Sequence, residues 1–138
     1  MLKMFIPMLF IDHSLLDSLS TQALASPRLR MNFNFHDSPE SPSQRLMNAL
    51  EPGTVLPVHR HRDTQETNIV LRGRLRVKAF DDGGELLEEW ELDPLKGAYG
   101  VNIPKGVWHT IEVLEPGTVI FEVKDGPYAP LGEEDVMV

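Results

Sequence analysis

The feature that most constrains this chain is a series of short strand-like segments separated by glycine and proline turns. Segments of this kind lie at residues 44–50, 66–71, 74–80, 86–92, 99–103, 107–114 and 118–124. Turn-forming pairs such as Pro52-Gly53 and Pro116-Gly117 stand between them. Many short strands at close spacing are typical of a sandwich or barrel, so the sequence predicts an all-β fold.

One helix and one further strand are expected ahead of these segments. Asp12 or Ser14 can cap a helix that ends at about Ala25, before Pro27. Its apolar face would contain Leu15, Leu16, Leu19 and Ala23. From Arg28 to His36 apolar and polar residues alternate, which predicts a strand. Its two faces would be Leu29, Met31, Phe33 and Phe35 on one side and Arg28, Arg30, Asn32, Asn34 and His36 on the other.

The 138 residues leave room for one domain. We expect an N-terminal arm over residues 1–36, a barrel over residues 37–130 and a loosely held acidic tail over residues 131–138. The apolar residues 1–11 are interpreted as an N-terminal strand or a segment at a subunit interface. The sequence from Leu50 to Leu56 nearly repeats from Leu114 to Ile120, which predicts two similar corners.

Charge and cysteine content narrow the classes of partner and metal. With 21 acidic and 13 basic residues the formal net charge is -8, which disfavours binding to nucleic acid. No membrane partner is expected, because the apolar run at the start is too short to span a bilayer. The chain has no cysteine, which fits a cytoplasmic protein and leaves His, Asp and Glu as metal ligands.

His59, His61, Glu66 and His109 are the candidate metal ligands. His59 and His61 are one residue apart, so on an extended strand both imidazoles point to the same face. A tight connection could bring Glu66 back beside them, and His109 follows a Pro-x-Gly turn on a later strand. Three imidazoles and one carboxylate suit one divalent transition metal, such as Zn, Fe, Mn, Ni or Cu, better than Ca or Mg.

These residues also resemble the motifs of the cupin superfamily. Residues Gly53 to Gly73 match the first cupin motif, G(x5)HxH(x3-4)E(x6)G, at every signature position. Residues Gly97 to His109 resemble the second, although the gap before Pro104 is one residue longer than usual and Val113 replaces a frequent Asn. The resemblance implies a small double-stranded β-helix, or jelly-roll barrel, with the four candidate ligands in the metal-binding roles. Small cupins commonly pair, so a homodimer is expected.

A closer resemblance is to the WbuC-type cupin-fold metalloproteins. It extends from about Ser26 to Tyr128 and rests on segments such as QRLMNALEPGT, PVHRH, VLRGRL, IPKGVWHT and LEPGTVIFEVKDGPY. That family is found alongside genes for bacterial surface-polysaccharide synthesis, and its activity is undefined. Together with the arginines beside the predicted barrel strands and the free positions expected on the metal, this association predicts a small-molecule ligand that is an anionic sugar derivative.

A second group of candidate residues lies on or beside the predicted barrel strands. Arg30, Asn34, His36 and Arg45 could bind an acidic ligand, since arginine forks suit carboxylate and phosphate groups. The same residues could instead form a polar outer strand face. Glu122 and Lys124 share one face of the last strand, and the sequence does not tell whether that face is inside. Trp108 should point away from His109 and serve packing.

Three functions are compatible with these features. The leading hypothesis is a metal-dependent enzyme that isomerises or epimerises a sugar or nucleotide-sugar intermediate of surface-polysaccharide synthesis. An Fe(II) oxygenase and a noncatalytic sensor or binding module are the alternatives. Cupin barrels support many chemistries, so the fold alone does not choose among them.

Overall fold

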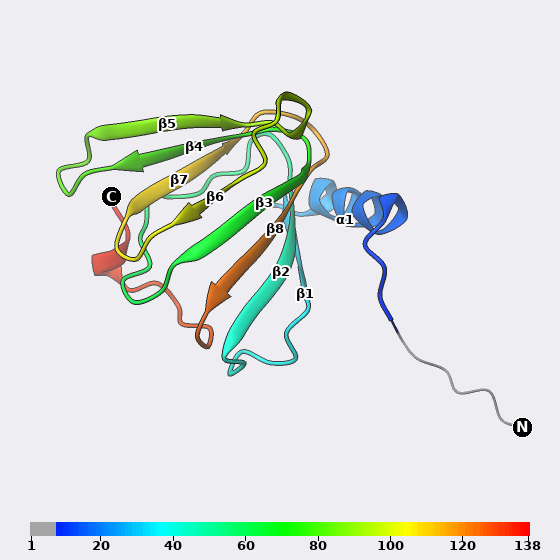
Figure 1. Ribbon diagram of the computed structural model, residues 1–138, viewed down its shortest axis with the longest axis horizontal. Coiled ribbons are helices and arrows are strands. Elements are labelled where there is room, and N and C mark those ends of the chain that lie inside the picture. Colours follow the sequence, from blue (N-terminus) through cyan, green and yellow to red (C-terminus); the bar gives the residue numbers. More distant parts are fainter. Residues whose placement is uncertain (1–7) are drawn as a thin grey trace, which may run out of the picture.

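The computed structural model describes residues 8–138 as two antiparallel sheets that face each other, with one helix outside (Figure 1). The larger sheet has the strand order β1-β2-β8-β3-β6 and the smaller one β5-β4-β7. The elements are α1 (His13–Ala25), β1 (Arg30–Asn34), β2 (Ser43–Leu50), β3 (Glu66–Arg72), β4 (Leu75–Phe80), β5 (Leu86–Leu92), β6 (Gly100–Ile103), β7 (Trp108–Val113) and β8 (Thr118–Asp125), with 3-10 turns at Pro94–Lys96 and Glu133–Asp135. The predicted all-β jelly-roll barrel with a short N-terminal helix is confirmed.

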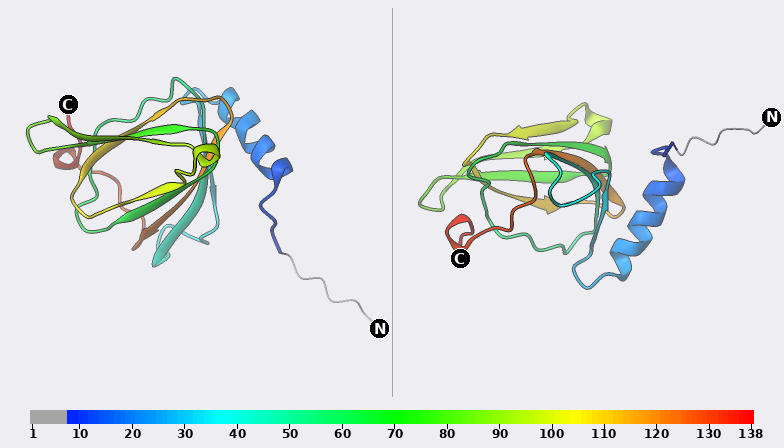
Figure 2. Two further views of the ribbon diagram at one scale, coloured as in Figure 1. Left: turned by 45° about the horizontal axis from the view of Figure 1, so that its top comes forward. Right: turned by 90° about the horizontal axis from the view of Figure 1, so that it is seen from below.

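Helix α1 forms where its cap and its apolar face predict it. The Asp12 carboxylate accepts a hydrogen bond from the Leu15 backbone N–H at 3.0 Å, which satisfies one free donor of the first turn. Leu16, Leu19 and Ala23 are buried against the outer face of the larger sheet, where they meet Met47, Ala49 and Val119. Figure 2 shows the helix lying outside this sheet. Residues 8–11 are exposed and form no strand, and residues 1–7 lie outside the described part.

Strand β1 starts two residues later than its alternation predicts. Leu29 has a φ of 57°, in the left-handed region, so the chain is not extended there. The bend directs the Leu29 carbonyl toward Glu51, whose backbone N–H donates to it at 2.9 Å, and toward Thr54, whose hydroxyl oxygen lies 2.9 Å away. From Arg30 onward β1 pairs with β2. The predicted N-terminal arm is therefore partly a strand of the larger sheet.

The two copies of the repeated sequence form similar corners, as predicted. In the first, the Thr54 hydroxyl donates to the Glu51 carbonyl at 2.7 Å, and in the second Thr118 donates to Glu115 at the same distance. The glycine within each corner, Gly53 or Gly117, has a positive φ.

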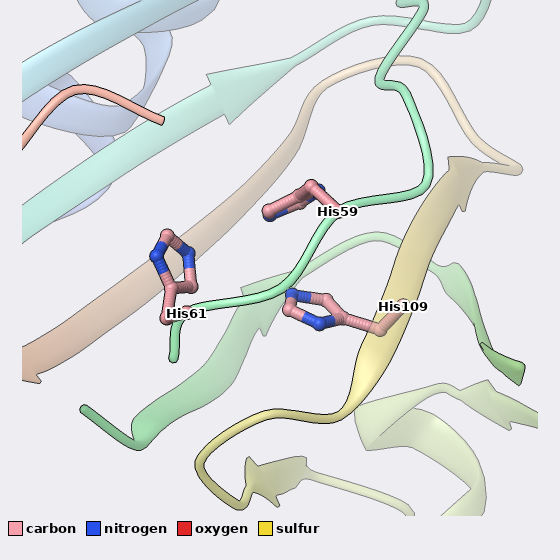
Figure 3. Close-up of side chains that lie close together, drawn as sticks. All are labelled: His59, His61 and His109. Carbon is pink, nitrogen blue, oxygen red and sulfur yellow. The ribbon is translucent and has the colours of Figure 1, made fainter. Parts of the chain in front are cut away.

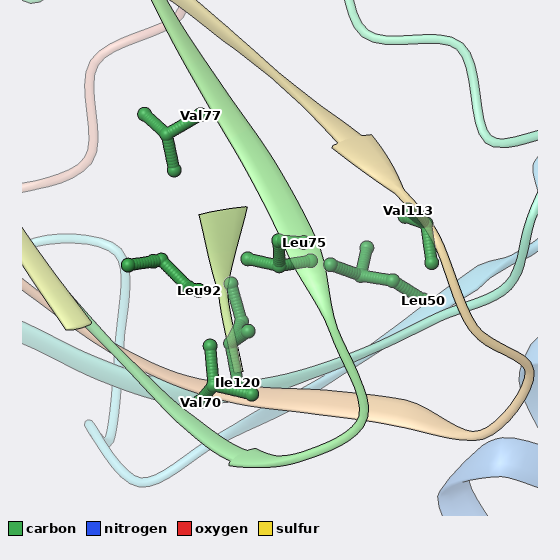
Figure 4. Close-up of a cluster of buried hydrophobic side chains, with 7 residues drawn as sticks. All are labelled: Leu50, Val70, Leu75, Val77, Leu92, Val113 and Ile120. Carbon is green, nitrogen blue, oxygen red and sulfur yellow. The ribbon is translucent and has the colours of Figure 1, made fainter. Parts of the chain in front are cut away.

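The barrel interior changes from apolar to polar along its length. One end is filled by Leu50, Val70, Leu75, Val77, Leu92, Val113 and Ile120 (Figure 4). On β8 the inward-facing residues are Ile120, Glu122 and Lys124 in order, because residues two apart share a face. The pairing register places Glu122 between Leu46 and Asn68, and Lys124 between Gln44 and Glu66. The open end of the barrel is thus lined by polar side chains.

The acidic tail is held against the barrel, in contrast to the loosely held segment expected from its composition. The Met137 backbone N–H donates to the Val58 carbonyl at 2.8 Å, and the Arg60 N–H donates to the Asp135 carbonyl at 3.0 Å. The Asp135 carboxylate lies 2.9 Å from Arg60 Nε and 3.0 Å from Arg62 Nε. Composition missed these contacts because they depend on two arginines more than seventy residues earlier in the chain.

Candidate metal centre

Backbone pairing brings the first and last candidate ligands together. The backbone N–H of His59 donates to the His109 carbonyl at 3.0 Å, and the reverse bond is 2.8 Å long. The His61 carbonyl accepts from the Gly106 N–H at 2.8 Å, which fixes the turn before β7 beside it. The three imidazole rings converge on one space (Figure 3), and their nitrogen atoms on the shared side lie within 4.8 Å of one another.

Hydrogen bonds orient two of the rings for metal binding. His59 Nδ1 lies 2.9 Å from the Pro57 carbonyl, and His109 Nδ1 lies 2.9 Å from the Val107 carbonyl. A carbonyl oxygen can only accept, so each Nδ1 must carry the proton. Each Nε2 then keeps its lone pair, which is the arrangement that imidazole metal ligands commonly show.

Glu66, the first residue of β3, completes the group. Its two carboxylate oxygens lie 3.3 Å from His61 Nε2 and 3.3 Å from His109 Nε2. The side chain is buried, and Asn68 Nδ2 donates to Oε1 at 3.2 Å. Burial alone would raise the pKa of Glu66, but the His109 and His61 imidazoles outweigh it and hold the pKa below its ordinary value. Glu66 is therefore ionised and available as an oxygen donor.

The two paired histidines titrate in opposite directions in the metal-free protein. Burial, aided by repulsion from His109, lowers the pKa of His59 from 6.5 to about 4. Burial also disfavours the charged form of His109, but the Glu66 carboxylate outweighs it and raises the pKa of His109. In the absence of metal, protons bind His109 before His59.

The residues present fit a transition metal. His109 Nε2 is buried and has no well-directed hydrogen bond to the described part of the chain, although Glu66 is near. A buried nitrogen without a partner is costly unless something binds it. A set of three imidazole nitrogens and one carboxylate oxygen could hold Zn, Fe, Mn or Ni. The structure thus brings together all four residues that the sequence singled out.

Two neighbouring cavities lie at the polar end of the barrel, and one of them is lined by all four of these residues. The metal-facing cavity, of about 170 Å³, is lined by His59, His61, Glu66 and His109, and also by Asn48, Asn68, Glu122 and Lys124. The polar cavity, of about 390 Å³, is lined by Asn32, Asn34, His36, Gln44 and Tyr128. Glu122 and Lys124 border both cavities, so the two are neighbours.

The candidate substrate residues separate into two groups. Asn34 and His36 line the polar cavity, and His36 Nδ1 accepts from the Arg45 backbone N–H at 3.1 Å. The Arg45 side chain is exposed and shares its face of β2 with Met47, which packs toward α1. Arg30 faces inward but pairs with Leu50 at the apolar end. Neither arginine lines the two cavities.

Glu122 and Lys124 are the site residues that sequence reasoning left open. The structure places both on the inner face of β8. Burial, followed by the negative charge of Glu66, raises the pKa of Glu122 to about 7, against the opposing effect of Lys124. The sequence did contain one signal for this placement. Glu122 and Lys124 lie two and four residues after Ile120 on an otherwise apolar strand, so all three share one face.

Trp108 points away from the metal-facing cavity, as predicted from its position beside His109. Its side chain is buried, and its indole N–H donates to the Asp82 carboxylate at 3.1 Å. The Arg60 guanidinium lies 4.4 Å from the ring centre, in cation–π contact. Trp108 and Arg60 thus pack the outer side of the two chain segments whose inner side carries His59 and His109.

The sequence of this chain matches the model of one protein family. The profile of a family described as a domain of unknown function (DUF6016) matches residues 11–92. No curated protein matches the chain significantly.

Within residues 8–138, no helix has the length and apolar character needed to cross a membrane.

Solved structures with the same fold are cupin-fold proteins. KdgF from Halomonas sp. is 17% identical, with a TM-score of 0.58 over 75% of this chain and 84% of that one. The capsular polysaccharide assembling protein CapF from Staphylococcus aureus is 20% identical, with a TM-score of 0.62 over 81% of this chain and 32% of that one. An oxalate decarboxylase from Bacillus subtilis, described with Mn(II) centres, is 22% identical, with a TM-score of 0.55 over 73% and 26%.

Proposed function

The chain belongs to the family described as a domain of unknown function (DUF6016), and we propose that it is a metal-dependent cupin enzyme acting on a small sugar derivative. The observation that carries the proposal is the convergence of His59, His61 and His109, two of them with Nε2 kept free by a backbone hydrogen bond. Glu66 supplies the fourth donor. A bound divalent metal would polarise a carbonyl or hydroxyl oxygen of the ligand.

The side chains around the four ligands suit proton transfer on a hydroxyl-rich molecule. Glu122 borders the metal-facing cavity, and a carboxyl group with a pKa of about 7 can give or take a proton near neutral pH. Asn34, His36 and Gln44 offer hydrogen-bonding groups in the adjoining cavity. Isomerisation or epimerisation needs a proton moved at a carbon beside a carbonyl. The resemblance to the WbuC-type family supports a sugar or nucleotide sugar as the substrate class.

Metal analysis of the purified protein tests the first half of this proposal. We expect about one equivalent of a transition metal per chain, retained through dialysis. The variants His61→Ala and His109→Gln should each lose it, because each removes one of four donors from a chain without cysteine. His36→Ala is the matched control and should keep the metal, since His36 lies outside the group. Full retention by both ligand variants contradicts the assignment.

A proton-exchange assay tests the second half. The metal-loaded protein, incubated in D₂O with panels of aldoses, ketoses and nucleotide sugars that carry a keto group, should incorporate deuterium at a carbon beside the carbonyl. Glu122→Gln should abolish the exchange while the metal stays bound. Oxygen consumption by the iron-loaded protein alone would favour the Fe(II) oxygenase alternative instead. Tight binding without exchange or oxidation would favour a noncatalytic sensor.

A further inference from the structure

Lys124 brings a positive charge to the two cavities beside the candidate metal ligands. Its side chain is partly buried and borders both the metal-facing and the polar cavity. The strand register sets it directly between Gln44 and Glu66. Within residues 8–138, no carboxylate oxygen lies within 4.0 Å of its ammonium group, although most of the chain's arginines form such pairs. A partly buried, unpaired ammonium group in an acidic protein favours binding of an anion.

Two amide oxygens in the metal-facing cavity also lack partners. Asn48 Oδ1 and Asn68 Oδ1 are both buried and have no hydrogen-bond partner among residues 8–138. Asn68 as a whole is 4% exposed, and its amide nitrogen is already used by Glu66. An unsatisfied buried acceptor costs about 1–3 kcal/mol, so groups of this kind usually meet a donor from water or a ligand. Hydroxyl groups are donors of the required type.

We propose that Lys124 binds the anionic group of a small polyhydroxylated ligand, while Asn48 and Asn68 accept hydrogen bonds from its hydroxyl groups. A ligand that contacts Lys124 and both asparagines would occupy the metal-facing cavity of about 170 Å³ and extend past Lys124 into the polar cavity of about 390 Å³. The inference rests on the proposed function for the position of the ligand beside the metal. It assigns the cationic role to Lys124, where the sequence had offered Arg30 or Arg45.

Calorimetric titration separates the charge contact from the hydroxyl contacts. The probes are glucuronate, glucose 6-phosphate and neutral glucose, added to the metal-loaded protein. Lys124→Met should weaken binding of at least one anion by about tenfold or more, because a charge-assisted hydrogen bond contributes about 1.5–3 kcal/mol. It should leave glucose binding unchanged. Preference for glucuronate over glucose 6-phosphate would identify the anion as a carboxylate, and the reverse preference as a phosphate.

Two further variants make the comparison decisive. Lys96→Met makes the same charge change on an exposed turn that borders neither cavity, so it should bind all probes as the wild type does. Asn48→Leu should weaken the charged and neutral probes alike. The inference is overturned if neither anion binds the wild type, or if Lys124→Met binds both anions as the wild type does. It is also overturned if Lys124→Met weakens glucose as much as the anions.

The metal-free protein distinguishes failure of this inference from failure of the proposed function. If the purified protein holds no metal and takes up none, the proposed function fails. The same titrations on that protein still test Lys124, because its place on β8 depends on strand pairing with β2 and β3. Anion binding that Lys124→Met abolishes would then support the anion site without the metal enzyme. Anion binding equal in both proteins would overturn it.

Discussion

Among single residues, Glu122 should make the stability of the metal-free protein depend on pH. Its folded pKa of about 7 lies above the ordinary value of 4.5, so its contribution to stability is fully present below about pH 4.5. The contribution is lost as pH rises through 7, because a buried carboxylate then has to carry its charge. Glu122→Gln cannot ionise, so it should raise the Tm relative to the wild type at pH 8 and change it little at pH 4.5.

Thermal unfolding of the metal-free wild type and the metal-free Glu122→Gln variant at about pH 4.5 and about pH 8 checks the prediction. Glu112→Gln is a suitable control, since Glu112 is exposed and paired with Arg76 on the outer side of β7. An advantage of Glu122→Gln that is equal at both pH values would contradict the assignment of the raised pKa to Glu122.

Gly73 closes the first motif for a steric reason. Its φ is 88°, and a Cβ placed on it would stand 2.7 Å from the Thr118 Cα. Thr118 is fully buried, so the backbone of β8 cannot move away cheaply. Gly73→Ala should therefore cost about 1–3 kcal/mol or more in the free energy of unfolding. Chemical denaturation measures this, with Gly97→Ala as control, because Gly97 has a similar φ but open space around it. Equal losses in both variants would show that the contact with Thr118 adds nothing.

At the scale of elements, the C-terminal tail and the segment that carries His59 and His61 form one unit. Arg60 and Arg62 alternate with the two histidines, so they point outward, and Asp135 binds both. Val136 pairs with His59 across the same segment. The tail thus holds the segment that carries the two ligands along the edge opposite the one that pairs with His109.

Asp135→Asn should weaken metal binding without removing a ligand. Loss of the carboxylate leaves two arginines unpaired beside the ligand segment, and changes to groups that orient ligands typically lower metal affinity by about 10–100-fold. Competition with a chromogenic chelator measures the affinity. Glu133→Gln is the control, because Glu133 is exposed in the same 3-10 turn and has no ion pair within the described residues. Unchanged affinity in Asp135→Asn would mean that the tail packs without positioning the ligands.

For the whole molecule, the sequence predicted what strand parity and turn residues determine locally. The helix, the β segments and the two similar corners follow from periodicity, caps and glycine-containing turns. The parity of His59 and His61 placed both on one face before any pairing was known. A tight connection after His61 allowed Glu66 to lie beside them, but the meeting with His109 depended on the resemblance to the cupin motifs, because distant strands meet through a register that single-sequence patterns do not encode.

The features that escaped prediction depend on long-range contacts. A period of two separates the faces of β8 but does not tell which one is inside, so Glu122 and Lys124 remained undecided. Arg45 looked similar to Arg30, yet the β1–β2 register puts their side chains on opposite faces of the larger sheet. The tail seemed loose because its partners, Arg60 and Arg62, are remote in sequence. Each of these depends on tertiary pairing rather than on local preference.

Metal binding should stabilise the whole barrel in a pH-dependent way. A ligand that binds only the folded state adds about 2.7 kcal/mol at a free concentration of 100 times its Kd. In a chain of this size that corresponds to a Tm increase of several degrees, since about 1 kcal/mol shifts the Tm by about 2–4 °C or somewhat more. Chelation of the metal should reverse the increase.

Because His109 has a raised pKa, it takes up a proton early as pH falls, and a protonated imidazole cannot bind metal. The increment measured at about pH 8 should therefore be larger than the increment measured at about pH 5, which lies below the reference His pKa of about 6.5. Differential scanning calorimetry with and without metal measures it, and His109→Gln should show no increment at either pH. An increment of the same size at both pH values in the wild type would contradict ligation by His109.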